Sequence, residues 1–151
     1  RSSGIYALVG ENQAVTTGRI GEDERFHVIA SRVVEDISQI ALAPGGEEVV
    51  CGLRDGTLLV LSTSTLEEIF RSTHGPHRVG GMDISRDGSV LATGYFDGEV
   101  VFWDTLTWEP QLSIRTSLTP IRDVEFSPDG QTLVVGGKGG HVAVFRSEPP
   151  P

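Results

Sequence analysis

Apolar and polar residues alternate along the chain in short runs, which are separated by turns rich in Asp and Gly. The stretch 79–104 shows the pattern clearly, because its three apolar runs end at Ile84, Thr93 and Trp103 with an Asp-Gly turn after each of the first two. The Asp side chain bonds nearby backbone amides and Gly accepts a positive φ, so such turns reverse the chain sharply. The pattern predicts an antiparallel meander of three strands, with residues 107–114 as a fourth, outer strand.

The same pattern recurs at a fixed interval. Segments that begin at Ile37, Val79 and Ile121 align without a gap, so the period is 42 residues. A period of about 40–45 residues that ends in Trp-Asp, here Trp103-Asp104, is typical of the four-stranded blades of a β-propeller. A single sheet cannot bury both of its faces, so neighbouring repeats must stack. The sequence therefore predicts an all-β fold built from propeller blades.

The repeats divide the chain into complete and partial blades. We expect the divisions 1–36 (partial, degenerate blade), 37–78 and 79–120 (blades), 121–146 (partial blade) and 147–151 (Pro-rich tail). In the first of these, strands are expected over 5–10, 14–20 and 24–30. Proline has no amide to donate, so the tail cannot supply a last outer strand. About three and a half blades form an incomplete ring with open β edges.

Two stretches between these strands need separate interpretation. Apolar residues in 26–42 satisfy helical spacing as well as the strand pattern, so a helix there is the alternative. The period of the later repeats favours strands. Farther along, Leu66, Ile69 and Phe70 predict the outer strand of the next blade. Residues 73–78, with Gly and Pro at their centre, predict the loop that follows it.

Three motifs resemble those of the WD-repeat (WD40) family of β-propellers. They are the Ser-Pro-Asp-Gly turn at 127–130, Thr93-Gly94 ahead of Asp97-Gly98, and Trp103-Asp104. The resemblance implies four-stranded antiparallel blades that act as a platform for binding other proteins.

The resemblance also implies a hydrogen-bonded tetrad in each blade, formed by the turn Asp, a Ser or Thr on the second strand, the Trp, and a His from the preceding loop. The middle repeat supplies Thr93, Asp97 and Trp103. Gly75 stands at the His position, with His74 and His77 beside it. The first repeat keeps only Asp55 and the last repeat has none of the four residues. Apolar packing between blades must therefore provide most of the stability.

Net charge and cysteine content limit the classes of partner and the cellular compartments that we expect. The formal net charge of −9 argues against nucleic-acid backbones and membrane surfaces as partners, because both attract basic faces. The single cysteine, Cys51, excludes an internal disulfide and suits a reducing compartment. We expect it to be a small buried residue on a second strand. The expected location is intracellular and cytoplasmic, with the nucleus or a cytoskeletal or ciliary assembly as alternatives.

Several residues could be read as chemical sites. The glycine-rich run 136–140 resembles a phosphate cradle, but it lacks the required spacing and leads into a strand, so a hairpin turn explains it. His74 and His77 have no third metal ligand at suitable spacing. The turn aspartates have a sufficient structural role, and the serines in 62–65 have no positioned His base. We expect no cofactor, no metal and no catalytic residue.

Exposed residues at the turns are better functional candidates. One set precedes the tight turns: Arg54, Phe96 and Lys138. The other set precedes the first strand of each blade: Asp36, Arg78 and Pro120. The resemblance implies that both sets cluster on the narrow face with which such propellers hold peptides.

Among these, Tyr95 and Phe96 are the pair that we expect to contact a partner, because aromatic and Arg side chains form interface hot spots. An aromatic residue beside a turn could instead cover the neighbouring blade. Trp108, on the opposite loop, has the same two interpretations: it anchors a partner or it shields the outer strand.

The function that we expect is a non-catalytic scaffold that binds other proteins, as peptides or as subunits of a larger complex. A first alternative is a structural part of a larger propeller, completed by further blades of the same polypeptide or of another chain. A second alternative is an enzymatic propeller, which would need clustered His and carboxylate groups at the central channel.

Overall fold

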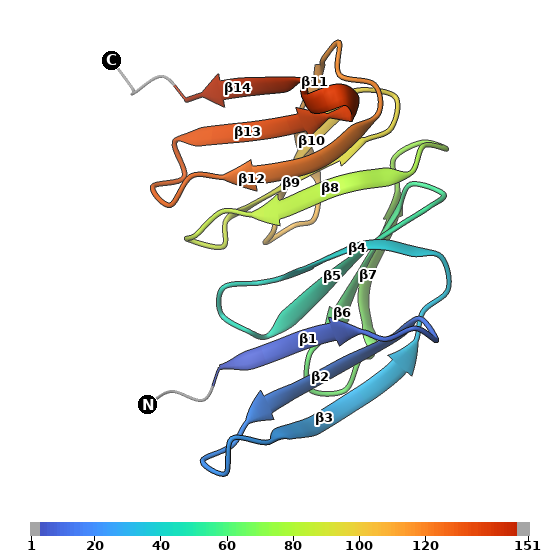
Figure 1. Ribbon diagram of the computed structural model, residues 1–151, viewed down its shortest axis with the longest axis vertical. Coiled ribbons are helices and arrows are strands. Elements are labelled where there is room, and N and C mark those ends of the chain that lie inside the picture. The colour runs from blue at the N-terminus through green and yellow to red at the C-terminus, as the bar shows by residue number, and fades with distance from the viewer. Residues whose placement is uncertain (1–3, 148–151) are drawn as a thin grey trace.

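The computed structural model describes residues 4–147, which form fourteen strands in four antiparallel sheets without closing a ring (Figure 1). The first blade contains β1 (Ile5–Val9), β2 (Ala14–Ile20) and β3 (Phe26–Val33). The second contains β4 (Ile37–Leu42), β5 (Glu48–Leu53), β6 (Thr57–Ser62) and β7 (Glu68–Thr73). The third contains β8 (Val79–Ile84), β9 (Val90–Tyr95), β10 (Glu99–Asp104) and β11 (Pro110–Arg115). The fourth contains β12 (Ile121–Phe126), β13 (Thr132–Gly137), the short 3₁₀ turn η1 (Lys138–Gly140) and β14 (Val142–Arg146).

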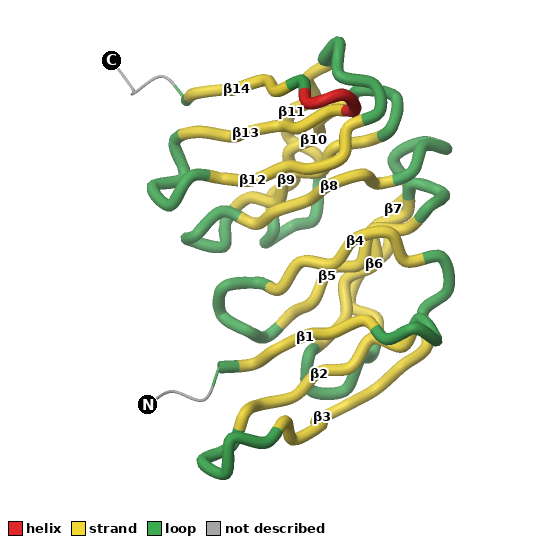
Figure 2. The backbone as a smooth tube through the Cα atoms, in the orientation of Figure 1, coloured by secondary structure: helices red, strands yellow, loops and turns green. Residues whose placement is uncertain are grey.

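Strands follow one another in chain order within every sheet, so each sheet is a meander (Figure 2). The predicted all-β fold of propeller blades is therefore confirmed. Residues 26–42, for which a helix was the alternative, form β3 and β4 instead. Among residues 4–147, no helix is long and apolar enough to cross a membrane. The Pro-rich tail expected over 147–151 lies outside the described residues, apart from Ser147.

Three strands begin later than the sequence pattern predicted. β11 starts at Pro110 rather than at residue 107, because the residues before it form a turn. In that turn the Asp104 carboxylate accepts hydrogen bonds from the backbone N–H groups of Leu106 (2.8 Å) and Thr107 (3.0 Å). β7 likewise excludes Leu66, and β3 begins at its Phe residue rather than at residue 24. Local turn hydrogen bonds thus take precedence over the apolar pattern at these ends.

The hydrophobic core lies between the blades. Successive side chains of a strand point to opposite faces of its sheet, so one strand contributes to two interfaces. On β6, Leu59 and Leu61 pack in the cluster shared with the first blade. Leu58 and Val60, on the same strand, pack in the cluster shared with the third blade. A third cluster lies between the third and fourth blades. Apolar stacking of blades is therefore what buries the sheets.

The inner strands β4, β8 and β12 lie side by side and approach closely. A Cβ atom on Gly81 would lie 2.6 Å from the Cα atom of Asp123, so only glycine fits at this point of β8. Between β4 and β8, the Ser38 hydroxyl donates a hydrogen bond to the carbonyl oxygen of Val79 (2.8 Å). The close approach fixes the ends of the inner strands, where the candidate site lies.

Candidate functional site: the turn rim

The two sets of turn residues meet at one end of the blades. Backbone hydrogen bonds join the sets in pairs, each with the first residue's N–H donating: Arg54 to Asp36 (2.9 Å), Phe96 to Arg78 (3.0 Å) and Lys138 to Pro120 (3.1 Å). We call these six residues the turn rim. The η1 turn marks this end of the molecule in Figure 1. Because the pairing recurs in three successive blades, the rim is a row of similar loop pairs held by the backbone.

Phe96 is the aromatic centre of the turn rim. The guanidinium carbon of Arg78 lies 5.0 Å from the ring centroid, and that of Arg122 lies 4.8 Å from it. Both distances are within the range of cation–π attraction. The ring is half-buried and Arg122 is exposed, while the Arg78 Nε atom is buried with no hydrogen-bond partner among residues 4–147. The rim thus presents a partly accessible aromatic ring in contact with two cations.

Arg122 was not among the predicted site residues. It follows Ile121, the first residue of β12, at a point where the register of pairing with β13 shifts. A β-bulge at this point re-aims a side chain. The sequence signal that could have found Arg122 is its position two residues after Pro120, a predicted rim residue.

An ionic network holds the tight turn of the third blade. Arg115 Nη1 lies 3.2 Å from Asp97 Oδ2, and Arg115 Nη2 lies 3.7 Å from Glu99 Oε2. From the loop before β8, His74 Nε2 lies 3.4 Å from Glu99 Oε2 and His77 Nε2 lies 3.8 Å from Asp97 Oδ2. The network joins the loop, the turn and the outer strand. Its role is to position the turn that carries Phe96.

The tetrad implied by the WD-repeat resemblance is half formed in the third blade. The Trp103 indole N–H donates a buried 2.9 Å hydrogen bond to the Thr93 hydroxyl. The His74 ring lies edge-on to Trp103 with centroids 5.6 Å apart. Asp97 contacts Arg115 and His77 rather than completing this chain.

In the second blade, the Asp55 carboxylate accepts a 3.0 Å bond from the Thr57 N–H, and hydrogen bonds from Thr57 hold the pKa of Asp55 below its usual value. In the second blade, the hydrogen bonds of Asp55 therefore stabilise its own turn.

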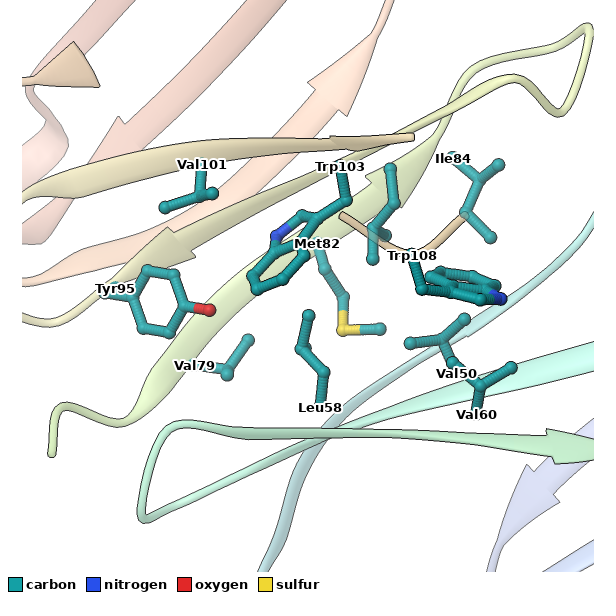
Figure 3. Packing of buried hydrophobic residues seen from close by; sticks show 11 residues of the cluster. Val50, Leu58, Val60, Val79, Met82, Ile84, Tyr95, Val101, Trp103 and Trp108 are labelled. Carbon is teal, nitrogen blue, oxygen red and sulfur yellow. The ribbon is translucent and has the colours of Figure 1, made fainter. Parts of the chain in front are cut away.

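The structure corrects the expectation that Tyr95 is exposed. Only 2% of its surface is accessible, and its ring packs between the second and third blades (Figure 3). The reason is that alternation along β9 places Tyr95 on the same face as Leu91 and Thr93, which is turned toward the second blade. Its hydroxyl has no hydrogen-bond partner among residues 4–147, and burial raises the pKa of Tyr95 to about 12. Contact with a partner is therefore a prediction for Phe96, not for Tyr95.

Trp108 shields the core rather than projecting from it. It is 6% exposed, and it lies among buried residues that include Val50, Val60 and Ile84 (Figure 3). Its ring stacks on Phe70 of β7 with centroids 6.1 Å apart. The backbone of Trp108 is left-handed, with φ of 57°, as is that of Leu66 (φ of 56°) at the same point of the second blade. Of the two interpretations of Trp108, the structure supports shielding.

Other chemical candidates have structural explanations. Run 136–140 is the end of β13 and the η1 turn, with Gly139 and Gly140 at φ of 83° and 81°. Cys51 is buried on β5, and burial raises its pKa to about 12. Within residues 4–147, no group of three or more His, Cys, Asp or Glu side chains could hold a metal ion.

Comparisons with known proteins agree with the blade architecture. The family model described as "WD domain, G-beta repeat" matches residues 67–104 and 108–146. The chain is 27% identical to the periodic tryptophan protein 2 homolog of Schizosaccharomyces pombe, over 81% of this chain and 14% of that protein. It is 32% identical to the mouse echinoderm microtubule-associated protein-like 2, over 80% of this chain and 18% of that protein.

A third relative is the mouse eukaryotic translation initiation factor 3 subunit I, which is 27% identical over 67% of this chain and 31% of that protein. The chain thus spans from 14% to 31% of the lengths of these three relatives.

Proposed function

The chain belongs to the WD-repeat family, and from this premise we propose that it is a scaffold that docks other proteins within a larger assembly through its turn rim. Members of this family are generally non-catalytic. The observation that supports the proposal is Phe96, half-buried under the guanidinium groups of Arg78 and Arg122. Aromatic and Arg side chains are the types that dominate binding energy at protein interfaces.

The charge of the rim suggests what kind of segment it binds. Arg54, Arg78, Arg122 and Lys138 lie along the rim of a protein whose formal net charge is −9. The rim also contains Asp36, and Asp97 lies in the turn of Phe96, so its charge is mixed. The two guanidinium groups at Phe96 are the cations that an acidic group of a partner could contact. We therefore propose that the partner presents an acidic peptide whose carboxylates reach the rim cations.

Rigidity of the rim supports binding by an already ordered surface. Three backbone hydrogen bonds hold its loop pairs, and the Arg115 network holds the turn of Phe96. A surface that is ordered before binding loses little conformational entropy on association.

The test is a comparison of variants against peptides selected from a random display library. Phe96→Ala should weaken binding about 30-fold or more, because a hot-spot residue contributes at least about 2 kcal/mol. Tyr6→Ala is the matched control, since Tyr6 is an aromatic residue that is 45% exposed on β1. Circular dichroism checks that both variants keep the fold. Equal affinity of wild type and Phe96→Ala would remove the rim from consideration.

A second candidate function is that of a structural part of a larger propeller. Its support is the apolar surface of the end blades, where Val33, Val134, Val142 and Val144 are between 39% and 61% exposed. Further blades in the same polypeptide or in another chain would cover it. Size-exclusion chromatography with light scattering tests this: a stable monomer contradicts a requirement for completion, and an obligate oligomer supports it.

We place the protein inside the cell, in the cytoplasm. The support is the single free cysteine and the likeness to a subunit of a translation initiation factor. Fluorescence microscopy of the tagged full-length gene product tests this placement.

A further inference from the structure

Residues 74–78, which connect β7 to β8, contain two histidines that face carboxylates, and we call this segment the histidine loop. His74 Nε2 lies 3.4 Å from Glu99 Oε2, and His77 Nε2 lies 3.8 Å from Asp97 Oδ2. Imidazole is the side chain whose charge changes between pH 5 and pH 8, whereas carboxylates ionise at lower pH. The two contacts are therefore ion pairs in weak acid, and their attraction falls when the histidines lose their protons.

Arg115 on β11 competes for the same two carboxylates. Its Nη1 atom lies 3.2 Å from Asp97 Oδ2, and its Nη2 atom lies 3.7 Å from Glu99 Oε2. The Arg115 side chain is 63% exposed, whereas those of Asp97 and Glu99 are 19% and 21% exposed. Because water reaches the carboxylates poorly, a charge that approaches them from the histidine loop acts more strongly than it would at the surface. Other charged or titratable groups beside the loop lie in the second-blade turn, at the end of the loop and on β9: Arg54, Asp55, Arg78 and Tyr95.

A second polar group lies beside His74 and has no partner. The centroid of the His74 ring is 5.6 Å from that of Tyr95 and 5.6 Å from that of Trp103. The Tyr95 hydroxyl is buried and has no hydrogen-bond partner among residues 4–147. A protonated imidazole has two N–H donors and no acceptor, but a neutral imidazole has one acceptor nitrogen. His74 therefore becomes an acceptor for the Tyr95 O–H only after it has lost its proton.

The histidine loop is joined directly to the turn rim. The carbonyl oxygen of its last residue, Arg78, accepts a hydrogen bond from the Phe96 N–H (3.0 Å), and the Arg78 guanidinium carbon lies 5.0 Å from the Phe96 ring centroid. Gly75, inside the loop, has a φ of 114°, and a Cβ atom there would meet nothing within 4 Å. The loop thus has space to move at Gly75, and a change in its pairing reaches Phe96 through Arg78.

We propose that the histidine loop is a pH-dependent switch for the turn rim. With both histidines protonated, the loop is held on the carboxylates of the third-blade turn and keeps Arg78 over Phe96. With both neutral, those pairs are lost, His74 turns to the Tyr95 hydroxyl, and Arg78 moves away from the Phe96 ring. The inference rests on the proposed docking function and adds its regulation, because affinity for a partner at the rim then falls as pH rises.

Nuclear magnetic resonance of the whole chain, without any partner, tests the switch itself. The Phe96 amide signal should shift between pH 5 and pH 8 together with the ring signals of His74, because the Phe96 N–H bonds to the histidine loop. Hydrogen exchange of the same amide, corrected for its intrinsic dependence on pH, should be about threefold faster or more at pH 8. Both results are expected because the bond to Arg78 opens more often when the loop is released.

Replacing the four histidines of the chain identifies which of them are involved. The double variant His74→Gln, His77→Gln keeps polar side chains that do not titrate, so the Phe96 amide should lose its shift. His27→Gln is the matched control, since His27 also faces a carboxylate, that of Asp23 at 2.8 Å, but lies on β3 of the first blade. His141→Gln tests the remaining histidine. Both of these variants should keep the wild-type shift.

Tyr95→Phe provides a test that does not depend on folding of the double variant. It removes only a hydroxyl that has no partner among residues 4–147, so the fold should survive. Neutral His74 then has no donor to turn to. The difference in Phe96 amide exchange between pH 5 and pH 8 should therefore become smaller than in wild type. An unchanged difference would contradict the role of Tyr95 in the switch.

Peptide binding measures the effect on the rim. The probe is a library-selected peptide that contains no histidine and that Phe96→Ala no longer binds. Its affinity for wild type should fall by about three- to tenfold from pH 5 to pH 8, because partly exposed ion pairs have modest energies. The double variant should bind it equally at both pH values.

The outcomes separate the switch from the docking function. If no library peptide depends on Phe96, the docking function fails, and the partner-free resonance measurements still decide the switch. A Phe96 amide that does not titrate between pH 5 and pH 8 would overturn the switch, and so would a double variant that keeps the wild-type shift. Equal affinity of wild type for the peptide at both pH values would overturn the regulation of the rim.

Discussion

The interfaces on the two sides of the third blade have the same framework and different degrees of closure. On the side of the second blade, Trp103 and Trp108 are 1% and 6% exposed, and a buried hydrogen bond joins Trp103 to Thr93. On the side of the fourth blade, Phe145, which aligns with Trp103, and Phe126, which aligns with Ile84, are half-buried and line an open groove. The inner strand β8 lies against an inner strand on both sides, β4 of the second blade and β12 of the fourth. Within residues 4–147, the second blade has four strands and the fourth blade has three.

Strand pairing therefore forms a blade, but it does not by itself close the interface between two neighbouring blades. Closure on the Trp108 side needs one large residue that a left-handed turn inserts between two sheets. On the other side, residues 4–147 place no such side chain between the sheets, and the aligned apolar residues line an open groove. The two interfaces can therefore be compared by removing or adding single side chains.

The largest effect should come from Trp108→Ala, which opens the closed interface. Removing a buried aromatic side chain costs about 3–5 kcal/mol of unfolding free energy, because transfer and cavity terms add. Urea unfolding followed by circular dichroism measures it. Leu106→Ala, at a neighbouring residue that is 91% exposed, should change the unfolding free energy very little. A Trp108→Ala loss as small as that of the control would mean that the residue does not close the interface.

A matched pair of leucines measures the same difference more finely. Leu91 and Leu133 occupy aligned positions of β9 and β13 and are 0% and 3% exposed. Leu91→Ala should cost about 2–5 kcal/mol, and Leu133→Ala should cost less because its site borders the groove and can relax. Unfolding in urea at one temperature compares them. Equal losses would contradict looser packing on the groove side.

The polar part of the comparison is the bond between Thr93 and Trp103. Thr93→Val keeps the shape but leaves the buried indole N–H without its acceptor, which should cost about 1–3 kcal/mol. Thr93→Ser keeps the hydroxyl and should cost less. Near-ultraviolet circular dichroism measures the change in the packing of the indole, and urea unfolding measures the change in unfolding free energy. If Val were tolerated better than Ser, packing alone would explain the closed side.

The smallest effect should come from Asp87, in the turn at the edge of the groove. Hydrogen bonds from the Ser85 hydroxyl and then from Ser89 lower the pKa of Asp87 to about 2. This is below the value of about 3.9 for an unfolded chain, so the carboxylate stabilises the fold above that pH and the gain is lost as pH falls toward 2.

Asp87→Asn should therefore be less stable than wild type at neutral pH, and the difference should shrink to zero in acid. Asp129→Asn, in the aligned turn of the fourth blade, should behave alike because the Ser127 hydroxyl lowers the pKa of Asp129. Thermal unfolding at a series of pH values provides the measurement. A stability difference independent of pH would show that ionisation of Asp87 is not involved.

Repetition is what made most of the fold predictable. Because the same strand and turn signals return every 42 residues, even the degenerate β2 was predicted from residue 14 to residue 20 as it is found. Side-chain direction was predictable only where the alternation is regular. Alternation along β9 puts Tyr95 on the same buried face as Leu91 and Thr93, so its burial could have been predicted. A register shift after Ile121 brings Arg122 over Phe96, and such a shift breaks the alternation on which a sequence argument relies.

The groove was beyond sequence reasoning for a different reason. Its lining residues come from six strands and two turns of two blades, so no local pattern brings them together. The 42-residue period aligns Phe102 and Phe145 with Val60 and Trp103, but only the spatial arrangement shows that the space beside them is open.

The most direct measurement of the central claim is the stability of a chain in which the sequence of residues 106–116 follows Ser147. This graft supplies the fourth blade with its own copy of Trp108 and β11. We expect its unfolding free energy to exceed that of the parent chain by at least about 2 kcal/mol, because a large apolar side chain becomes buried. The same graft carrying Trp108→Gly should gain much less. If both grafts unfold at the same urea concentration as the parent chain, the groove is not the empty counterpart of the Trp108 site.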